Sequence, residues 1–139
     1  MSRVFFDSNI LVYLFDRGAP GKRRRAHELF AAHSADGSLL LSTQVLQEFF
    51  VAVTRKLSTP MSGDDALQAL QRLAVYSTVQ IDATLIIRAA ERYRRDMLSF
   101  RDGLIVEAAL AGGATRLLSE DLQHGREVAG LVIENPFRS

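Results

Sequence analysis

The sequence predicts an α/β fold: a three-layer α/β/α sandwich with a central, mainly parallel five-stranded sheet. Short apolar runs alternate along the chain with stretches in which apolar residues recur at helical spacing. Most of these runs have no polar face, as expected of strands that are covered by helices on both sides. At this length and apolar content we expect one domain spanning residues 1–139.

The first part of the chain predicts a strand, two helices and a second strand. Arg3 to Phe6 contains a continuous apolar run, and the Asp7-Ser8-Asn9 sequence directly after it can start a helix. A second helix is expected from Pro20 to about His33, because proline fits the first helical turn. After a turn at Asp36-Gly37, residues 39–41 are all leucine and predict the second buried strand.

The middle of the chain predicts two further helices and a short strand. Ser42 and Thr43 can cap a helix that runs to about residue 57. Beyond a breaker segment around Pro60, Ser62 has capping-box spacing to Asp65, which predicts a helix up to about residue 74. Residues 78–81 then predict the third strand.

The last part predicts two helices followed by two strands. Asp82 can cap a long helix that extends to about residue 97, and the next helix is expected over 102–110, ended by Gly112-Gly113. Residues 116–118 and 131–133 are apolar and predict strands four and five.

Composition excludes several classes of site. The chain has no cysteine, so a thiol nucleophile, an iron–sulfur cluster, a disulfide framework and Cys-ligated zinc are excluded. A reducing compartment is compatible with this, and we expect a cytoplasmic protein. No apolar stretch approaches the ~20 residues that span a bilayer, so no membrane association is expected. The net charge of +1 does not indicate a general polyanion binder.

Four carboxylates are the candidate functional residues: Asp7 and Asp121, which follow predicted strands, and Glu48 and Asp102, which lie near helix starts. Ligands of parallel sheets bind beyond the carboxyl ends of the strands, where such residues converge. The sequence obliges no lysine or arginine to neutralise any of the four. If they meet, their mutual repulsion therefore requires a cation, and a hard divalent metal is the natural candidate.

Each carboxylate also has a purely structural interpretation. Asp7 can be a helix N-cap, and Glu48 lies off the centre of its apolar stripe, as a solvated residue would. Asp102 can complete a capping box that begins at Ser99, and Asp121 can be a loop acid. These alternatives stay open for each residue taken alone.

If the four do converge, Mg²⁺ or Mn²⁺ suits the ligand types, because magnesium is bound by a few carboxylates and several waters. Such an ion activates water and stabilises charge on a phosphoryl oxygen, which favours phosphodiester hydrolysis. Asn9 and Ser119 are then candidates for orienting the carboxylates or the attacking water.

Several blocks of the chain resemble one known family. The segment Phe6-Asp7-Ser8-Asn9-Ile10-Leu11-Val12-Tyr13 comes first, followed in order by Gln47-Glu48-Phe49, Asp102 at a helix start, the 118–125 segment LSEDLQHG and the closing Asn135-Pro136-Phe137. Together they resemble PIN-domain ribonucleases, most closely the VapC toxins of type II toxin–antitoxin systems. The resemblance covers essentially the whole chain.

The resemblance implies a PIN-like fold and an Mg²⁺- or Mn²⁺-dependent endoribonuclease that acts on RNA, commonly structured tRNA or rRNA. It also implies a cognate antitoxin that blocks the site, and a homodimer. Position by position, Asp7, Glu48, Asp102 and Asp121 match the family's catalytic and metal-binding acids, and Asn9 and Ser119 match its polar companions.

The sequence departs from the family pattern beside the third acid. Relatives usually have an aromatic residue before it and alanine after it, whereas Arg101 and Gly103 flank Asp102 here. Arg101 can pair with Asp102 or contact RNA phosphate. Together with Arg95 and Arg24 it is our candidate for RNA contact.

Two alternatives from other functional classes are considered. A phosphorelay receiver domain also gathers acids and Mg²⁺ at strand ends, but it needs a lysine after a late strand, and Lys22 and Lys56 both lie in the first half. A catalytically silent PIN-like interaction module is the second alternative, and the presence of all four acids argues against it.

Overall fold

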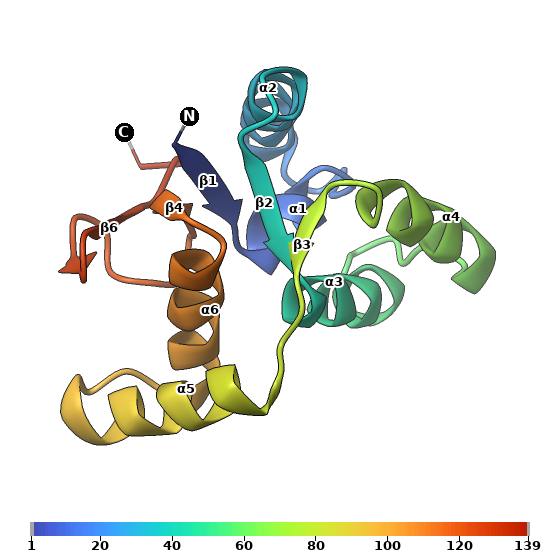
Figure 1. Cartoon of the computed structure of the whole chain (residues 1–139). Coiled ribbons are helices and arrows are strands. Elements are labelled where there is room, and N and C mark those ends of the chain that lie inside the picture. The colour runs from blue at the N-terminus through green and yellow to red at the C-terminus, as the bar shows by residue number, and fades with distance from the viewer. Residues whose placement is uncertain (1, 139) are drawn as a thin grey trace.

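The computed structural model describes residues 2–138, and its strands form one six-stranded sheet (Figure 1). The strands are β1 Arg3–Phe6, β2 Leu39–Ser42, β3 Ser77–Val79, β4 Ala114–Leu118, β5 Glu127–Val128 and β6 Leu131–Glu134. Their order is β3-β2-β1-β4-β6-β5, and every neighbouring pair is parallel except β5 and β6. The predicted mainly parallel sheet is confirmed, but the predicted number of strands is one too few.

The missed strand is the two-residue edge strand β5. It pairs antiparallel with β6 through a two-residue connection, Ala129-Gly130, in which both residues have positive φ, 51° and 87°. Positive φ at both central positions is what a tight type I′ hairpin turn requires. Because β5 is only Glu127-Val128, it carries no apolar run from which a strand could be predicted.

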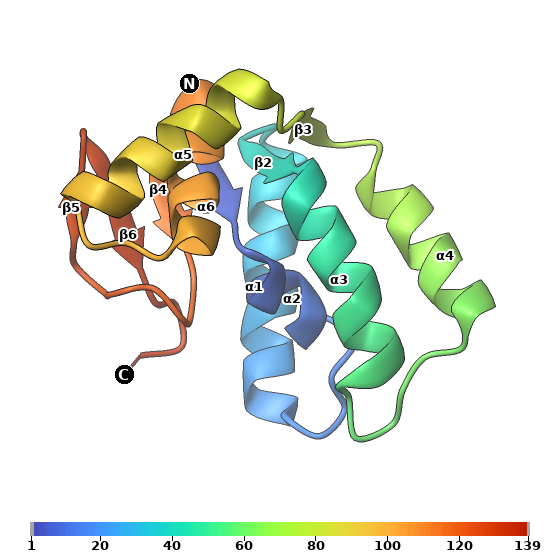
Figure 2. The same ribbon diagram turned by 90° about the horizontal axis from the view of Figure 1, so that it is seen from below.

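Six helices cover the sheet in the described part of the chain: α1 Ser8–Tyr13, α2 Pro20–Ala35, α3 Thr43–Arg55, α4 Gly63–Leu73, α5 Ala83–Arg95 and α6 Phe100–Ala111. Helix α6 packs on the strands with α5 outside it, while α1, α2 and α3 lie on the opposite side and α4 packs against α3 (Figures 1 and 2). The predicted three-layer arrangement is therefore confirmed.

The helix starts follow the predicted caps. Ser42 Oγ accepts a hydrogen bond from the backbone N–H of Val45, and Ser62 and Asp82 cap α4 and α5 in the same way. The central strands are buried on both faces, with Phe5, Phe6 and Leu117 at 0% exposure. This explains their unbroken apolar runs. Among residues 2–138, none of the helices has the length and apolarity needed to cross a membrane.

Candidate active site

The neighbouring parallel strands β1 and β4 bring Asp7 and Ser119 together at their carboxyl ends. Phe6 is in register with Leu118, and the backbone N–H of Asp7 donates to the Leu118 carbonyl at 2.9 Å. Ser119 Oγ then donates to Asp7 Oδ2 at 2.7 Å, and both residues are fully buried. Asp7 therefore lies at this edge of the sheet, as predicted, and Ser119 is hydrogen-bonded to it.

Asp7 is also the N-cap of α1, because its Oδ1 accepts a hydrogen bond from the backbone N–H of Ser8 at 2.7 Å. The interpretation of Asp7 as a helix N-cap is therefore confirmed. It does not exclude a functional one, since a carboxylate has about four lone-pair directions and the cap uses one. Capping fixes the direction in which the Asp7 carboxylate points.

Asp121 lies beside the first turn of α1 and contacts Asn9. Asn9 Nδ2 donates to Asp121 Oδ2 at 3.1 Å, and Asn9 Oδ1 accepts from the backbone N–H of Glu120 at 3.1 Å. Ser119 Oγ accepts from the backbone N–H of Asp121 at 3.2 Å. Asn9 and Ser119 therefore hold the loop after β4, as expected of side chains that orient the acids.

Glu48 and Asp102 reach the same place from helices on opposite sides of the sheet. Glu48 projects from α3, and its Oε1 accepts from Ser8 Oγ at 2.9 Å while its Oε2 accepts from Gln44 Nε2 at 3.2 Å. Asp102 is in the first turn of α6, where Ser99 Oγ accepts from its backbone N–H at 3.0 Å. Ser99 is therefore the cap, as its capping-box spacing allows, and the Asp102 carboxylate stays available to the site.

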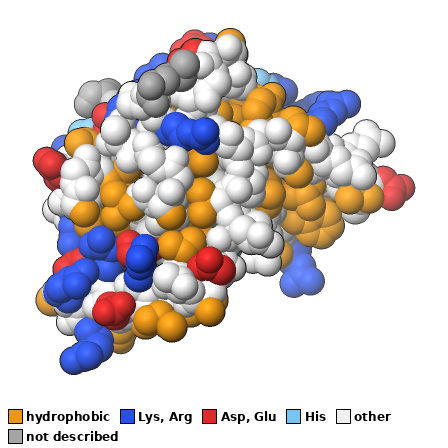
Figure 3. All heavy atoms as spheres, in the orientation of Figure 1, with side chains coloured by type: hydrophobic (Ala, Val, Ile, Leu, Met, Phe, Trp, Pro, Cys, Tyr) orange, Lys and Arg blue, Asp and Glu red, His pale blue; other side chains and the backbone are white. Residues whose placement is uncertain are grey.

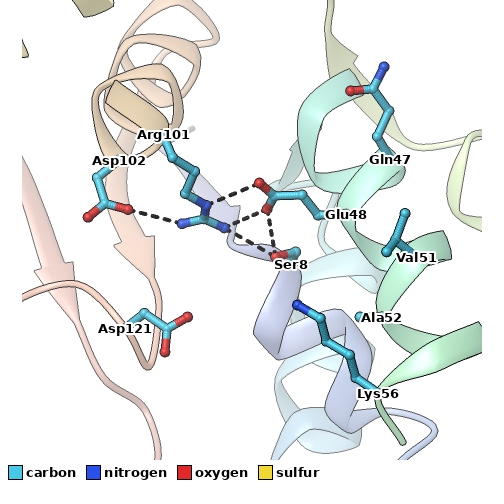
Figure 4. A pocket seen from close by; sticks show the side chains of 9 residues that line it. All are labelled: Ser8, Gln47, Glu48, Val51, Ala52, Lys56, Arg101, Asp102 and Asp121. Carbon is cyan, nitrogen blue, oxygen red and sulfur yellow. Dashed lines mark hydrogen bonds and ion pairs between the residues drawn. The ribbon is translucent and has the colours of Figure 1, made fainter. Parts of the chain in front are cut away.

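We call Asp7, Glu48, Asp102 and Asp121 the acidic cup. The guanidinium of Arg101 lies between Glu48 and Asp102 (Figure 4) and also contacts Asp7. Arg101 Nη2 contacts Asp7 Oδ1 at 2.7 Å and Glu48 Oε1 at 2.5 Å, and Nη1 contacts Asp102 Oδ1 at 3.2 Å. Arg101 Nε donates to Glu48 Oε2 at 3.1 Å. One side chain thus bridges carboxylates from the residue after β1, from α3 and from α6.

The sequence obliged no lysine or arginine to neutralise these acids, but in the structure Arg101 pairs with three of them, and the option that it pairs with Asp102 is confirmed. Arg101 precedes Asp102 in the same helical turn, and its long side chain reaches back into the cup. Burial acts to lower the pKa of Arg101, but its hydrogen bonds and charge interactions with Glu48 and Asp7 outweigh burial and raise it. For Glu48, burial acts to raise the pKa, and the hydrogen bond and charge of Arg101 bring it below its usual value.

The cup opens into a pocket of about 470 Å³. Its wall is made by Ser8, Gln47, Glu48, Val51, Ala52, Lys56, Arg101, Asp102 and Asp121 (Figure 4). Glu48 and Asp102 keep 31% and 28% of their side-chain surface exposed, so solvent reaches the carboxylates. The interpretation of Glu48 as an ordinary solvated residue is wrong, because its carboxylate faces this pocket and is hydrogen-bonded there.

Three side chains of the site were not predicted: Ser8, Gln44 and Lys56. Ser8 links Glu48 to Arg101, because its Oγ donates to Glu48 and accepts from Arg101 Nη2 at 3.2 Å. Gln44 stands one helical turn before Glu48 and contacts the Arg101 carbonyl at 3.3 Å. Lys56 lines the pocket and has no ion pair within residues 2–138. Gln44 was detectable as the i−4 neighbour of Glu48 on a helix.

The donor set fits a hard divalent cation in its chemistry. The cup supplies four carboxylates, and Gln44 Oε1 is a buried side-chain oxygen without a hydrogen-bond partner among the described residues. Oxygen donors of this kind are what Mg²⁺ and Mn²⁺ prefer. As the side chains stand, however, no three acidic or histidine groups within residues 2–138 are arranged to hold a metal ion. The Arg101 guanidinium lies between the carboxylates that would have to share one.

The other two candidates for RNA contact lie outside the cup. Arg95, at the end of α5, is 63% exposed in its side chain and pairs with Asp96 at 3.2 Å. Arg24 lines a separate surface hollow on α2 together with Arg17 and Arg23. Arginine and acidic side chains are interspersed over the α5 end of the molecule (Figure 3). Contact with RNA stays a prediction for Arg24, Arg95 and Arg101.

Comparison with solved structures finds the same fold in toxin–antitoxin proteins. A toxin–antitoxin complex from Klebsiella pneumoniae matches with a TM-score of 0.70 and 19% identity, covering 98% of this chain and 99% of that one. A VapC toxin of Mycobacterium tuberculosis that cleaves the sarcin-ricin loop matches with a TM-score of 0.65 and 21% identity, covering 82% and 86%.

A third match is VapBC2 from Rickettsia felis, bound to a DNA fragment from its promoter, with a TM-score of 0.67 and 18% identity over 95% and 97% of the two chains. No curated protein sequence matches significantly. The family model of the PIN domain matches residues 4–130, which include all four members of the acidic cup. The chain therefore belongs to the PIN domain family.

Proposed function

We propose that this protein is a VapC-type toxin: a cytoplasmic, Mg²⁺- or Mn²⁺-dependent endoribonuclease that hydrolyses phosphodiesters of structured RNA such as tRNA or rRNA and is inhibited by a cognate antitoxin. The observation that carries the proposal is the convergence of Asp7, Glu48 and Asp102 on one cationic group. Three carboxylates from distant parts of the sequence contact one guanidinium, that of Arg101. Because the chain belongs to the PIN domain family, this arrangement supports a nuclease site.

The chain's own residues support this chemistry in separate ways. Asp7 is oriented by Ser119 and by the backbone of Ser8, and Asp121 is oriented by Asn9. A divalent cation, when bound, would supply an activated water and would stabilise charge on a phosphoryl oxygen. Asp7, Glu48, Asp102 and Asp121 are the residues that would hold it.

Positive charge for the RNA backbone is available at the same pocket. Lys56, the residue after α3, and Arg101 of α6 both line it. A phosphate at the mouth of the pocket would meet Lys56 directly, and Arg101 once its guanidinium turns away from the carboxylates. Such contacts bind RNA without regard to sequence and weaken with salt.

One observation favours the catalytically silent interaction module as a second candidate. Arg101 fills the position at which a cation would have to bind, and relatives of the family usually have an aromatic residue there. A PIN fold that had lost catalysis would have an arginine in this place as a permanent structural counterion. The receiver-like alternative has no such support, since the family match is to PIN domains.

Cleavage of RNA by the purified protein separates these candidates. We expect cleavage of a total tRNA and rRNA mixture in Mg²⁺ or Mn²⁺ and none in excess EDTA, with Asp7→Asn reducing the rate by at least about 100-fold. Asp64→Asn, on the exposed surface of α4, is the matched control and should cleave normally. Robust cleavage in EDTA, or equal activity of Asp7→Asn, would overturn the nuclease proposal.

The partners are proposed from the same family context. The neighbours from Klebsiella pneumoniae and Rickettsia felis are toxin–antitoxin complexes, which supports a cognate antitoxin for this chain as well. We also propose a homodimer, as the family resemblance implies. Light scattering coupled to size exclusion tests it: twice the mass of the 15.4 kDa chain at micromolar concentration is expected, and a monomer would contradict it.

A further inference from the structure

We propose that the Arg101 guanidinium and a divalent cation are alternative occupants of the acidic cup, so that metal binding displaces Arg101 and releases it toward RNA phosphate. The inference rests on the proposed function and adds to it a regulation of the site by the chain's own side chain. It makes metal loading and RNA binding mutually dependent.

The first argument is that Arg101 uses all of its nitrogens inside the cup. Nε contacts Glu48, Nη1 contacts Asp7 Oδ2 and Asp102, and Nη2 contacts Asp7 Oδ1, Glu48 and Ser8. In this position the guanidinium fork is engaged with protein on every side. It has no free face with the paired donors that bidentate binding of a phosphate needs.

The second argument is that the carboxylates are equally engaged. Both Asp7 oxygens and both Glu48 oxygens accept from Arg101. A magnesium ion would need some of the same oxygens at about 2.0–2.1 Å, well inside the distance at which they now hold a guanidinium. Two cations cannot use those lone pairs together, so one has to leave.

The third argument is that Arg101 has a route out. Its side chain is 33% exposed and lines the open pocket, so the guanidinium can turn toward solvent by rotation about its own side-chain bonds. Asp102 stays in place in that event, because Ser99 holds its backbone N–H. Opening the cup therefore requires movement of one long side chain and not of a helix.

Exchange of partners follows from these three points. Leaving the cup costs Arg101 its contacts with three carboxylates, and a phosphate at the pocket mouth replaces them with a bidentate contact. A divalent cation in turn takes the place of Arg101 as the partner of the carboxylates. Each ligand therefore removes the obstacle to the other, and by thermodynamic linkage each raises the affinity of the other by the same factor.

The test measures Mn²⁺ binding to the intact protein by isothermal titration calorimetry without RNA. Arg101→Gln removes the competing charge, and we expect it to bind Mn²⁺ more tightly than wild type by a factor of about 5 to 150, the usual range of coupling between sites. Arg88→Gln, an exposed arginine on α5 without an ion pair in residues 2–138, is the matched control and should match wild type.

The second half of the test adds a non-cleavable oligonucleotide, a 2′-deoxy analogue of an RNA loop. We expect it to tighten Mn²⁺ binding to wild type, and to do so much less for Arg101→Gln. Arg101→Lys, which keeps the charge but loses the fork, should bind Mn²⁺ with intermediate affinity. It also provides a folded comparison if Arg101→Gln loses its cooperative thermal transition.

The outcomes separate the inference from the proposed function. Equal or weaker Mn²⁺ binding by folded Arg101→Gln would overturn the inference while leaving metal-dependent cleavage intact. Tighter Mn²⁺ binding without RNA cleavage by any variant would support the inference and contradict the nuclease. Absence of Mn²⁺ binding by all variants would overturn both.

Discussion

Two arginines of this molecule lie among carboxylates, and the charges around them are balanced differently. Arg92 of α5 contacts Asp96 at 2.8 Å and Glu107 of α6 at 3.2 Å, and Asp96 also contacts Arg95. Two cations there meet two anions. Arg101 alone meets three carboxylates in the acidic cup.

The difference favours a structural role for the α5–α6 cluster and is compatible with the functional role proposed for the acidic cup. The α5–α6 cluster is formally neutral, and its central pair is nearly buried, with 11% and 10% of the Arg92 and Glu107 side chains exposed. A neutral buried cluster joins two helices and leaves no charge for a ligand to use. The cup retains negative charge after Arg101 is counted, which is unfavourable for folding but attracts a second cation.

The largest effect on stability is therefore expected in the balanced cluster. Glu107→Ala leaves the guanidinium of Arg92 buried with one fewer partner, and we expect the free energy of unfolding to fall by about 3 kcal/mol. Chemical denaturation of the purified variant measures this. Mn²⁺ binding should be unchanged if the variant is folded, because Glu107 lies outside the cup. A loss below about 1 kcal/mol would mean that the pair behaves as an exposed one.

A smaller effect is expected when the cup loses one of its surplus acids. Asp102→Asn leaves Asp7 and Glu48 to pair with Arg101 and relieves repulsion among the carboxylates. We therefore expect the free energy of unfolding to change by less than about 1 kcal/mol, whereas Mn²⁺ affinity should fall. Calorimetry and denaturation on the same preparation test both parts. A loss of stability as large as that of Glu107→Ala would remove the distinction between the two clusters.

The sequence predicted the fold more completely than it predicted the difference between the α5–α6 cluster and the acidic cup. Five strands were predicted because apolar runs such as Val4 to Phe6 are visible locally, and β5 was not, because Glu127-Val128 has no such pattern. The meeting of Asp7 with Ser119 follows from the rule that parallel strands end at one edge. Glu48 and Asp102 were named as candidates from their places near helix starts and from the family resemblance, but their approach to Asp7 could not be derived, since it depends on how α3 and α6 pack.

Pairing of Arg101 with Asp102 was one of two roles that the sequence allowed, but its contacts with Asp7 and Glu48 could not be predicted, for a physical reason. Arginine has many rotamers, and the field that selects one of them comes from Asp7 and Glu48, which are 94 and 53 residues away in the chain. Gly103, the other departure from the family pattern beside Asp102, is also explained by distant parts of the chain. A Cβ there would lie 3.1 Å from the Ala89 carbonyl oxygen, so glycine allows α6 to approach α5 closely.

The smallest effect is expected at an exposed balanced pair, Arg116 and Glu134 on the neighbouring strands β4 and β6. They contact at 2.8 Å with 40% and 33% of their side chains exposed, so Glu134→Gln should lower the free energy of unfolding by only about 0.5 kcal/mol near neutral pH.

The hydrogen bond from Arg116 lowers the pKa of Glu134 in the folded state, so the unfolded chain takes up the proton first as the pH falls. The contribution is therefore complete above the usual glutamate pKa of 4.5 and is lost as the pH falls through the lowered folded value. Urea unfolding of wild type and Glu134→Gln across this range should converge at the acid end, with Glu127→Gln on β5 as control. A difference that persists in acid would mean that packing, and not charge, is what the pair contributes.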